Sequence, residues 1–258
     1  MADATNILHP DIADMLKKME NIFSRFGVDF YLVGAVARDI HLSGKEQFAA
    51  KRKTRDVDLA VMIADEEQFY AIKDALTATG EFTPHETEAI KLFYKNGIEV
   101  DLLPFGNIEN EHRETRLHKP KLFTMDMPGF LEVYPFVEKI TIAGSSFNVC
   151  SLEGLVILKL IANDDNPGRT KDITDIEHFV EIYFELNGEE IYTDYMDVLD
   201  LYDTNTNNYL QLISTRIIGR IMGNILNGND NIIDRLKLIV AKRPTDIWQA
   251  MLAGMNDI

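Results

Sequence analysis

The sequence predicts an α+β fold, in which an α/β head with a mixed β-sheet is followed by a helical C-terminal region. Residues 9–26 carry apolar side chains at helical spacing, which predicts an amphipathic first helix. Short apolar strands then alternate with helices as far as residue 103, a pattern typical of a sheet covered by helices. After Ser151 only helical patterns follow. We therefore expect one domain over residues 1–150 and a helical domain over residues 151–258.

Most of the predicted elements have a local signal. Gly27 ends the first helix, because glycine readily adopts the conformation that closes a helix. Asp65 is a good N-cap, and Lys95-Asn96-Gly97 separates two apolar runs as a hairpin turn does. The polar residues 106–120 carry no predicted element. The predicted elements are helix 9–26, strand 29–33, helix 35–42, strand 57–63, helix 65–78, a hairpin of strands 90–94 and 98–103, a hairpin of strands 139–142 and 147–150, and helices from residue 151 onward.

Length, charge and cysteine content limit the class of protein. With 258 residues, 46% of them apolar, the chain can bury a substantial core. Its net charge of −16 argues against broad non-specific binding of nucleic acid, but it leaves room for a local basic groove and suits a basic partner. Cys150 is the only cysteine, so no internal disulfide can form, as expected in the reducing cytoplasm. The N-terminus lacks the features of a signal peptide, and no apolar run is long enough to cross a bilayer, so we expect a cytoplasmic protein with no membrane partner.

Three aspartates form the strongest chemical signal. Asp56 and Asp58 lie two residues apart in a predicted strand, so their side chains point to the same face. Asp101 lies on another predicted strand and has apolar neighbours on both sides, whereas Glu99 shares its face and competes for the same role. Three such carboxylates make an oxygen cage suited to Mg²⁺, and two such ions can clamp a triphosphate for in-line displacement. The competing interpretation is a set of solvated acids at strand starts.

A glycine turn precedes the aspartates. The apolar strand ending at Val33 breaks at Gly34 and Ala35 into a helix, and this arrangement offers backbone N–H groups to an anion. Arg38 follows in that helix. Two interpretations of Arg38 stay open: an ion pair with Asp39 or a neighbouring helix, and a position facing the triphosphate or the acids.

The stretch from Lys45 to Arg55 is basic in an otherwise acidic chain. It contains five basic residues and one acid, Glu46. One interpretation is an arm that contacts the triphosphate or a nucleic-acid acceptor. The other is a solvated surface loop.

Lys159 and Asp172 lie in the helical region. Lys159 is surrounded by apolar residues in its helix, so its ammonium either reaches water or meets an anion. Asp172 comes at the start of the next helix, where the helix dipole alone explains a carboxylate.

Residues 29–103 resemble the nucleotidyltransferase head of the DNA polymerase β type, shared with poly(A) polymerases and CCA-adding enzymes. The run from Val33 to Asp39 is similar to their glycine–glycine–x–x–Arg–Asp turn, with Ala35 in place of the second glycine. The Arg-Arg-Asp-Phe-Thr-Ile-Asn-type segment of CCA-adding enzymes is absent, and the gap from Gly34 to Asp56 is longer than usual. Residues 152–180 instead resemble the abortive-infection nucleotidyltransferase toxins, in which an apolar helix with a lysine precedes a basic turn and Lys-Asp-x-x-Asp.

The resemblance implies a Mg²⁺-dependent nucleotidyltransferase that moves NMP from an NTP to an acceptor hydroxyl and releases pyrophosphate. It implies two Mg²⁺ ions on Asp56, Asp58 and Asp101, with Asp101 also taking the acceptor proton. It further implies nucleotide contacts from the residues Gly34, Ala35, Arg38 and Lys159, with Asp172 supporting the site.

The acceptor and the partner stay open at this point. The acceptor is a tRNA 3′ end, a small molecule such as an aminoglycoside, or a protein hydroxyl, and a cognate antitoxin is an expected partner. The alternatives are a non-catalytic nucleotide-sensing or interaction module of the same fold and an antibiotic-type small-molecule nucleotidyltransferase.

Overall fold

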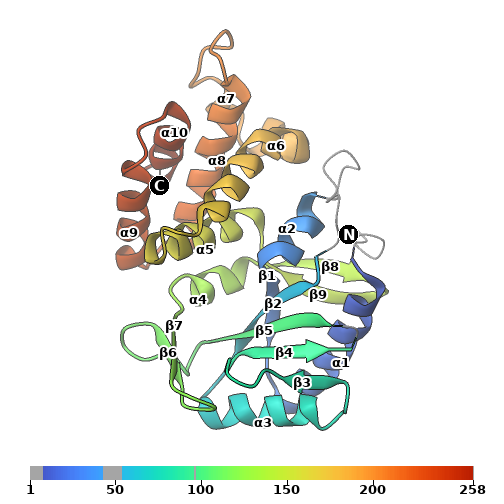
Figure 1. The fold of residues 1–258 in the computed structure, drawn as a ribbon. Coiled ribbons are helices and arrows are strands. Elements are labelled where there is room, and N and C mark those ends of the chain that lie inside the picture. Colours follow the sequence, from blue (N-terminus) through green and yellow to red (C-terminus); the bar gives the residue numbers. More distant parts are fainter. Residues whose placement is uncertain (1–7, 43–53, 96, 258) are drawn as a thin grey trace. The chain divides into compact units, whose positions relative to one another are not determined.

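The computed structural model describes residues 8–42, 54–95 and 97–257 (Figure 1). The chain divides into two compact units, Met1–Ser151 and Leu152–Ile258. The first is built on a sheet and the second is helical. This is the α+β architecture predicted from the sequence.

A mixed seven-stranded sheet forms the first unit, with strand order β3-β4-β5-β2-β1-β9-β8. β2 runs parallel to β5, and β1 runs parallel to β9, while the other neighbours are antiparallel. Both predicted hairpins, β4–β5 and β8–β9, are present. The strands are β1 (Phe30–Val33), β2 (Asp56–Met62), β3 (Phe82–Pro84), β4 (Lys91–Tyr94), β5 (Ile98–Phe105), β8 (Glu138–Ile142) and β9 (Ser145–Val149).

Three helices accompany this sheet. α1 (Pro10–Phe26) buries the face predicted from its apolar spacing, and Gly27 ends it at φ 63°. α2 (Gly34–Leu42) starts directly after β1 and packs on β1 and β2. α3 (Glu66–Thr77) begins at Asp65, whose side chain accepts a hydrogen bond from the backbone N–H of Gln68.

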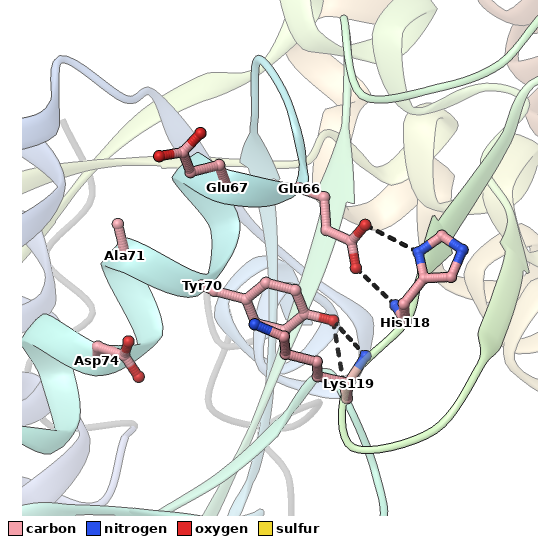
Figure 2. A pocket seen from close by; sticks show the side chains of 7 residues that line it. All are labelled: Glu66, Glu67, Tyr70, Ala71, Asp74, His118 and Lys119. Atoms are coloured by element: carbon pink, nitrogen blue, oxygen red, sulfur yellow. Dashed lines mark hydrogen bonds and ion pairs between the residues drawn. The ribbon is translucent and has the colours of Figure 1, made fainter.

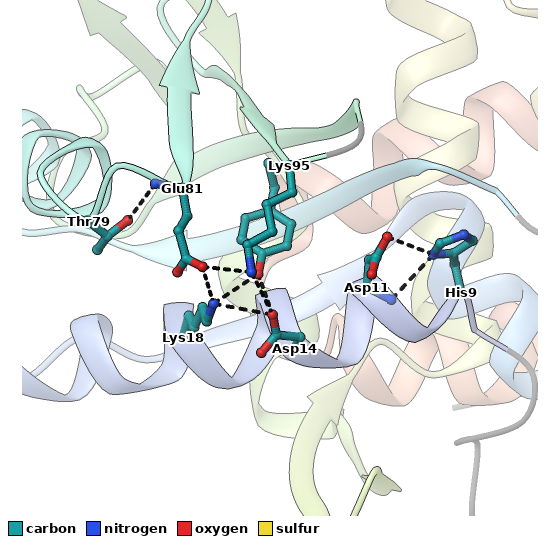
Figure 3. Close-up of polar contacts among 8 residues, drawn as sticks. His9, Asp11, Asp14, Lys18, Thr79, Glu81 and Lys95 are labelled. Atoms are coloured by element: carbon teal, nitrogen blue, oxygen red, sulfur yellow. Dashed lines mark hydrogen bonds and ion pairs between the residues drawn. The ribbon is translucent and has the colours of Figure 1, made fainter.

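A polar network ties α1 to the far edge of the sheet (Figure 3). Asp14 accepts a 2.5 Å hydrogen bond from the Tyr94 hydroxyl, and the ammonium groups of Lys18 and Lys95 each lie 3.2 Å from the same carboxylate. Both ammonium groups also pair with Glu81. The tyrosine hydrogen bond and the two lysines lower the pKa of Asp14 to about 2.

Three strands of this unit were not predicted from the sequence. β3 is only three residues long and contains a proline, which gives it no period-2 pattern. β6 (Glu114–Leu117) and β7 (Phe123–Asp126) pair as a separate hairpin inside and just beyond the stretch predicted to lack elements. Arg113, at φ 62° directly before β6, pairs with Glu109 and Glu132, which flank the hairpin in the sequence. Such contacts leave no hydrophobic period in the sequence. The short helices α4 (Phe130–Val133) and η2 (Tyr134–Phe136) follow.

The second unit is helical, as predicted. Two of its helices, α8 (Tyr209–Ile225) and α10 (Asp246–Met255), approach closely because each presents a glycine to the other's backbone. A Cβ atom on Gly219 would lie 2.2 Å from the carbonyl oxygen of Met251, and one on Gly254 would lie 2.1 Å from that of Arg216. Among the helices of the described residues, none combines the length and hydropathy that a bilayer-spanning segment requires. The helices are α5 (Leu152–Asp165), α6 (Thr170–Asp194), α7 (Met196–Leu199), α8 (Tyr209–Ile225), α9 (Asp230–Ala241) and α10 (Asp246–Met255).

Candidate active site

The register of β2 and β5 brings the predicted carboxylates together. Asp58 is the Cα partner of Asp101, and Asp56 is the partner of Glu99, across two parallel strands. Partnered residues on neighbouring strands point to the same face, at a strand spacing of about 4.8 Å. The four acids therefore share one face, while the alternate residues of β5, such as Val100, are buried on the other. Asp56 is exposed at the strand start, whereas Asp58 and Asp101 are half-buried.

Gly34 lies directly against Asp58. The glycine opens α2 at φ 63°, immediately after Val33, which is the register partner of Asp58 on β1. A Cβ atom on Gly34 would lie 2.0 Å from Oδ2 of Asp58 and 2.9 Å from its Cγ. Only glycine allows this approach, so the predicted strand–glycine–helix turn and the predicted aspartate contact each other. Ala35 follows as the second residue of α2.

Asp101 is the most unusual of the three aspartates. Its Oδ1 atom is buried and accepts no hydrogen bond. Burial raises the pKa of the Asp101 carboxyl, and the ammonium of Lys91 opposes this shift from 4.0 Å away. A buried oxygen without a hydrogen bond is costly unless another group satisfies it. The atom is thus a ready acceptor for a cation or a proton.

The assignment of Asp56, Asp58 and Asp101 as ligands of two Mg²⁺ ions stays a prediction. Within residues 8–42, 54–95 and 97–257, no group of three His, Cys, Asp or Glu side chains is arranged to hold a metal ion. Like charges on neighbouring strands repel, and here Lys91 already pairs with Glu99. The donor set still fits Mg²⁺, since it consists of carboxylates alone and one of them has a buried oxygen without a hydrogen bond.

Lys91 is the residue of this face that sequence reasoning missed. It lies on β4 opposite Asp101, and its ammonium contacts Glu99 and lies 3.4 Å from Glu88. The hydrogen bond to Glu99 raises the pKa of Lys91. The hairpin turn at residues 95–97 was predicted, and counting outward from it would have placed Lys91 beside the acids.

Arg38 makes an ion pair with Asp39, one of the two interpretations left open. Its Nε and Nη2 atoms lie 2.9 and 2.8 Å from Oδ1 of Asp39, which is buried. The four lysines and arginines at positions 45 and 51–53 lie outside the described residues, and of the basic stretch only its C-terminal end, Arg55, is described.

Lys159 meets its anions within the helical unit. Its Nζ atom lies 2.9 Å from Oδ1 of Asp172 and 2.7 Å from Oδ2 of Asp175, and its side chain is only 13% exposed. Arg169 donates to the other oxygen of Asp172 at 2.7 Å. Of the two interpretations left open for Lys159, water or an anion, the structure shows an anion, which two aspartates of the chain supply. The nucleotide contacts of Lys159 and Asp172 stay a prediction.

A separate hollow lies on α3 and contains none of the predicted site residues (Figure 2). His118 donates its backbone N–H to Glu66, and its ring lies 2.8 Å from the same carboxylate. The backbone N–H of Lys119 donates to the hydroxyl of Tyr70. Further carboxylates, those of Glu67 and Asp74, also line the hollow, which makes it unsuited to a triphosphate.

Sequence comparison decides the family. The family described as "Nucleotidyl transferase AbiEii toxin, Type IV TA system" matches residues 19–257. The chain belongs to this family. Membership in the AbiEii family makes the chain a nucleotidyltransferase of the toxin–antitoxin class and confirms the resemblance seen in residues 29–103 and 152–180. No curated protein matches the chain.

Three solved structures show distant similarity to this AbiEii-family chain. An antigenic nucleotidyltransferase-like protein from Paracoccidioides brasiliensis is 15% identical, with 96% of this chain and 94% of that chain covered and a TM-score of 0.45. ANT(2")-Ia in complex with adenylyl-2"-tobramycin is 14% identical, with 70% and 93% covered and a TM-score of 0.40. The CCA-adding enzyme in apo form II is 14% identical, with 95% and 68% covered and a TM-score of 0.35.

Proposed function

We propose that the first unit transfers a nucleoside monophosphate from an NTP to an acceptor hydroxyl and releases pyrophosphate. One observation carries the proposal: Asp58 and Asp101 are register partners on parallel strands, and Gly34 lies against Asp58 where a side chain would collide with it. This places two carboxylates and the N-terminus of α2 at one point of the sheet. Acids for a cation and backbone N–H groups for phosphate are the two things that a nucleotidyl-transfer site needs.

Each residue of the site has a separate role in the proposed reaction. The acceptor oxygen forms a bond to the α-phosphorus, the bond from that phosphorus to the bridging oxygen breaks, and pyrophosphate leaves. The carboxylate of Asp101 takes the proton of the acceptor hydroxyl, a role supported by the raised pKa that burial gives it. Gly34 and Ala35 leave the backbone open to the phosphates. Asp56, Asp58 and Asp101 would hold two Mg²⁺ ions, which when bound neutralise the triphosphate.

We propose a polyanionic acceptor, with the tRNA 3′ end as the first candidate. The five cations between Lys45 and Arg55 support this choice, since phosphate contacts are made by clustered lysine and arginine. The stretch immediately precedes Asp56 in the sequence. A small-molecule acceptor and a non-catalytic nucleotide sensor are the alternative outcomes of the test below.

We also propose a cognate antitoxin and a cytoplasmic location. The family description, a toxin of a type IV toxin–antitoxin system, supports the first. The single cysteine, buried at position 150, suits the reducing cytoplasm where NTPs are found.

The test is label transfer from each of the four α-labelled NTPs, with Mg²⁺ and total RNA, followed by separation of RNA, protein and small-molecule fractions. We expect label in the tRNA band and none with Asp58→Asn or Asp101→Asn. Asp126→Asn is the control, because this exposed aspartate is also part of a strand but lies on the separate β6–β7 hairpin. Label in the protein or small-molecule fraction would show that the acceptor is not tRNA. NTP binding without transfer to any fraction would support the non-catalytic nucleotide sensor.

A further inference from the structure

Lys91 completes a row of charged residues across three neighbouring strands. β4 and β5 are antiparallel with Lys91 opposite Asp101, and Asp101 is in turn the partner of Asp58 on β2. Register partners point to the same face, so the lysine shares the face of the acids. This row contains one cation and two carboxylates, and the carboxylates of Asp56 and Glu99 lie in the adjacent row.

The ammonium of Lys91 divides its contacts unequally. It makes a hydrogen-bonded ion pair with Glu99, lies 3.4 Å from Glu88, and stays 4.0 Å from Oδ1 of Asp101. The side chain is 15% exposed, so water screens these interactions only in part. Asp101 is therefore the carboxylate that keeps a buried oxygen without a hydrogen bond, although it is the direct register partner of the lysine.

The pairing of Lys91 with Glu99 and not with Asp101 is important, because the sequence alone does not distinguish these two acids of β5. Both point to the same face of β5, two residues apart, and either could serve as the third carboxylate beside Asp56 and Asp58. Carboxylates that are paired with a lysine are poor ligands for a second cation, since the cation and the ammonium repel each other. Glu99, which pairs with Lys91, is therefore a poorer metal ligand than Asp101.

We propose that Lys91 is a positioning residue that selects Asp101 over Glu99 as the third carboxylate of the site. It neutralises Glu99, holds it toward β4, and leaves Asp101 open to a divalent cation. The inference rests on the proposed function, because it assigns a role at the same site. Beyond that function, Lys91 gives the physical reason why Asp101 and not Glu99 is the third carboxylate.

The test is a double-mutant cycle read by metal binding. Free Mn²⁺ is measured by electron paramagnetic resonance, with and without a non-hydrolysable NTP analogue. The proteins compared are the wild type, Lys91→Met, Glu99→Gln, the double variant and Asp101→Asn. Circular dichroism checks that each variant is folded, and Lys91→Gln replaces Lys91→Met if the latter is not.

Opposite shifts are expected from the two single variants. Lys91→Met should bind Mn²⁺ about tenfold more tightly, because a cation next to the site is lost and Glu99 is released. Glu99→Gln should bind about tenfold more weakly although Glu99 is not a ligand, because the freed lysine ammonium turns to Asp101. The double variant removes one charge of each sign, so its affinity should return to the wild-type value. Asp101→Asn should bind weakly.

Other outcomes of the Mn²⁺-binding experiment would contradict the proposed role of Lys91 or the metal site itself. If the double variant binds as weakly as Glu99→Gln, Glu99 is itself a ligand and the inference is wrong, while the proposed function stands. If Lys91→Met leaves the Mn²⁺ affinity unchanged, the lysine has only a structural role. If the wild-type protein binds no Mn²⁺ with or without the NTP analogue, the metal site of the proposed function fails, and the inference fails with it.

Discussion

Replacing Gly34 with alanine should remove most of the transfer activity while the first unit stays folded. Gly34 has φ 63°, and a residue with a Cβ atom in this conformation costs roughly 1–2 kcal/mol. The new Cβ would also lie 2.0 Å from Oδ2 and 3.2 Å from Cβ of Asp58. The closest atom ends a side chain with two rotatable bonds, so we expect the carboxylate to turn away while the backbone stays in place.

The two effects have different magnitudes. Backbone strain of roughly 1–2 kcal/mol should lower the melting temperature by roughly 2–8 °C for a unit of this size. The displaced carboxylate should lower the transfer rate by about 100-fold or more, since a shift of about 1 Å at a reacting centre has that effect. Initial rates with labelled NTP and thermal unfolding followed by circular dichroism measure the two separately.

Gly27→Ala is the matched control for this variant. Gly27 has the same φ of 63° in the same unit, but a Cβ atom there would meet nothing within 4 Å. It should lose similar stability and keep the wild-type transfer rate. If Gly34→Ala is as active as the wild type, or if both variants lose activity equally, the contact with Asp58 does not set the activity and the argument is refuted.

Three further variants test the packing and charge of the structure. Gly219→Ala should cost about 1–3 kcal/mol in urea unfolding, because its Cβ meets the rigid backbone of Met251, whereas Gly188→Ala, with nothing within 4 Å, should not destabilise. Lys159→Met should cost about 3 kcal/mol, because it removes the ammonium that pairs with the carboxylates of Asp172 and Asp175, and an unchanged unfolding midpoint would refute this. Asp14→Asn should cost no more than about 1 kcal/mol at pH 7, because Asp14 is half-exposed and screened. Its carboxylate has a pKa lowered from 3.8 to about 2, so its stabilisation is complete above pH 3.8 and lost toward pH 2. The stability of the variant should therefore change less than that of the wild type between those pH values.

The sequence predicted those parts of the structure that depend on local pattern. The periodicity of α1, the glycine at its end and the Asp65 cap are properties of single segments, and all three are present. The same holds for the strand–glycine–helix turn at Gly34. By contrast, the β6–β7 hairpin is flanked by the ion pair between Arg113 and Glu132, 19 residues apart, which no local pattern indicates.

The sequence also did not predict which charged residues of other helices or strands form ion pairs. The apolar surroundings of Lys159 left open whether its ammonium reaches water or meets an anion, and they did not indicate which anion. The helix start at Asp172 was interpreted as an effect of the helix dipole, whereas in the structure the same carboxylate also receives the lysine. Residues 13 positions apart on two helices meet here through packing of the helices, which a single-segment pattern does not contain.

Strand register explains why the candidate site was predicted in outline but not in detail. The period of a strand places Asp56 with Asp58, and Glu99 with Asp101, from the sequence alone. The period does not indicate which acid of β2 is the register partner of which acid of β5. A shift of the register by one residue would move every side chain of a strand to the other face of the sheet. The observed register puts Asp58 beside Asp101, and the β4–β5 hairpin puts Lys91 on the other side of the same aspartate. In the role proposed for Lys91, the identity of the third carboxylate depends on three strands together, because a lysine on β4 selects between two acids of β5.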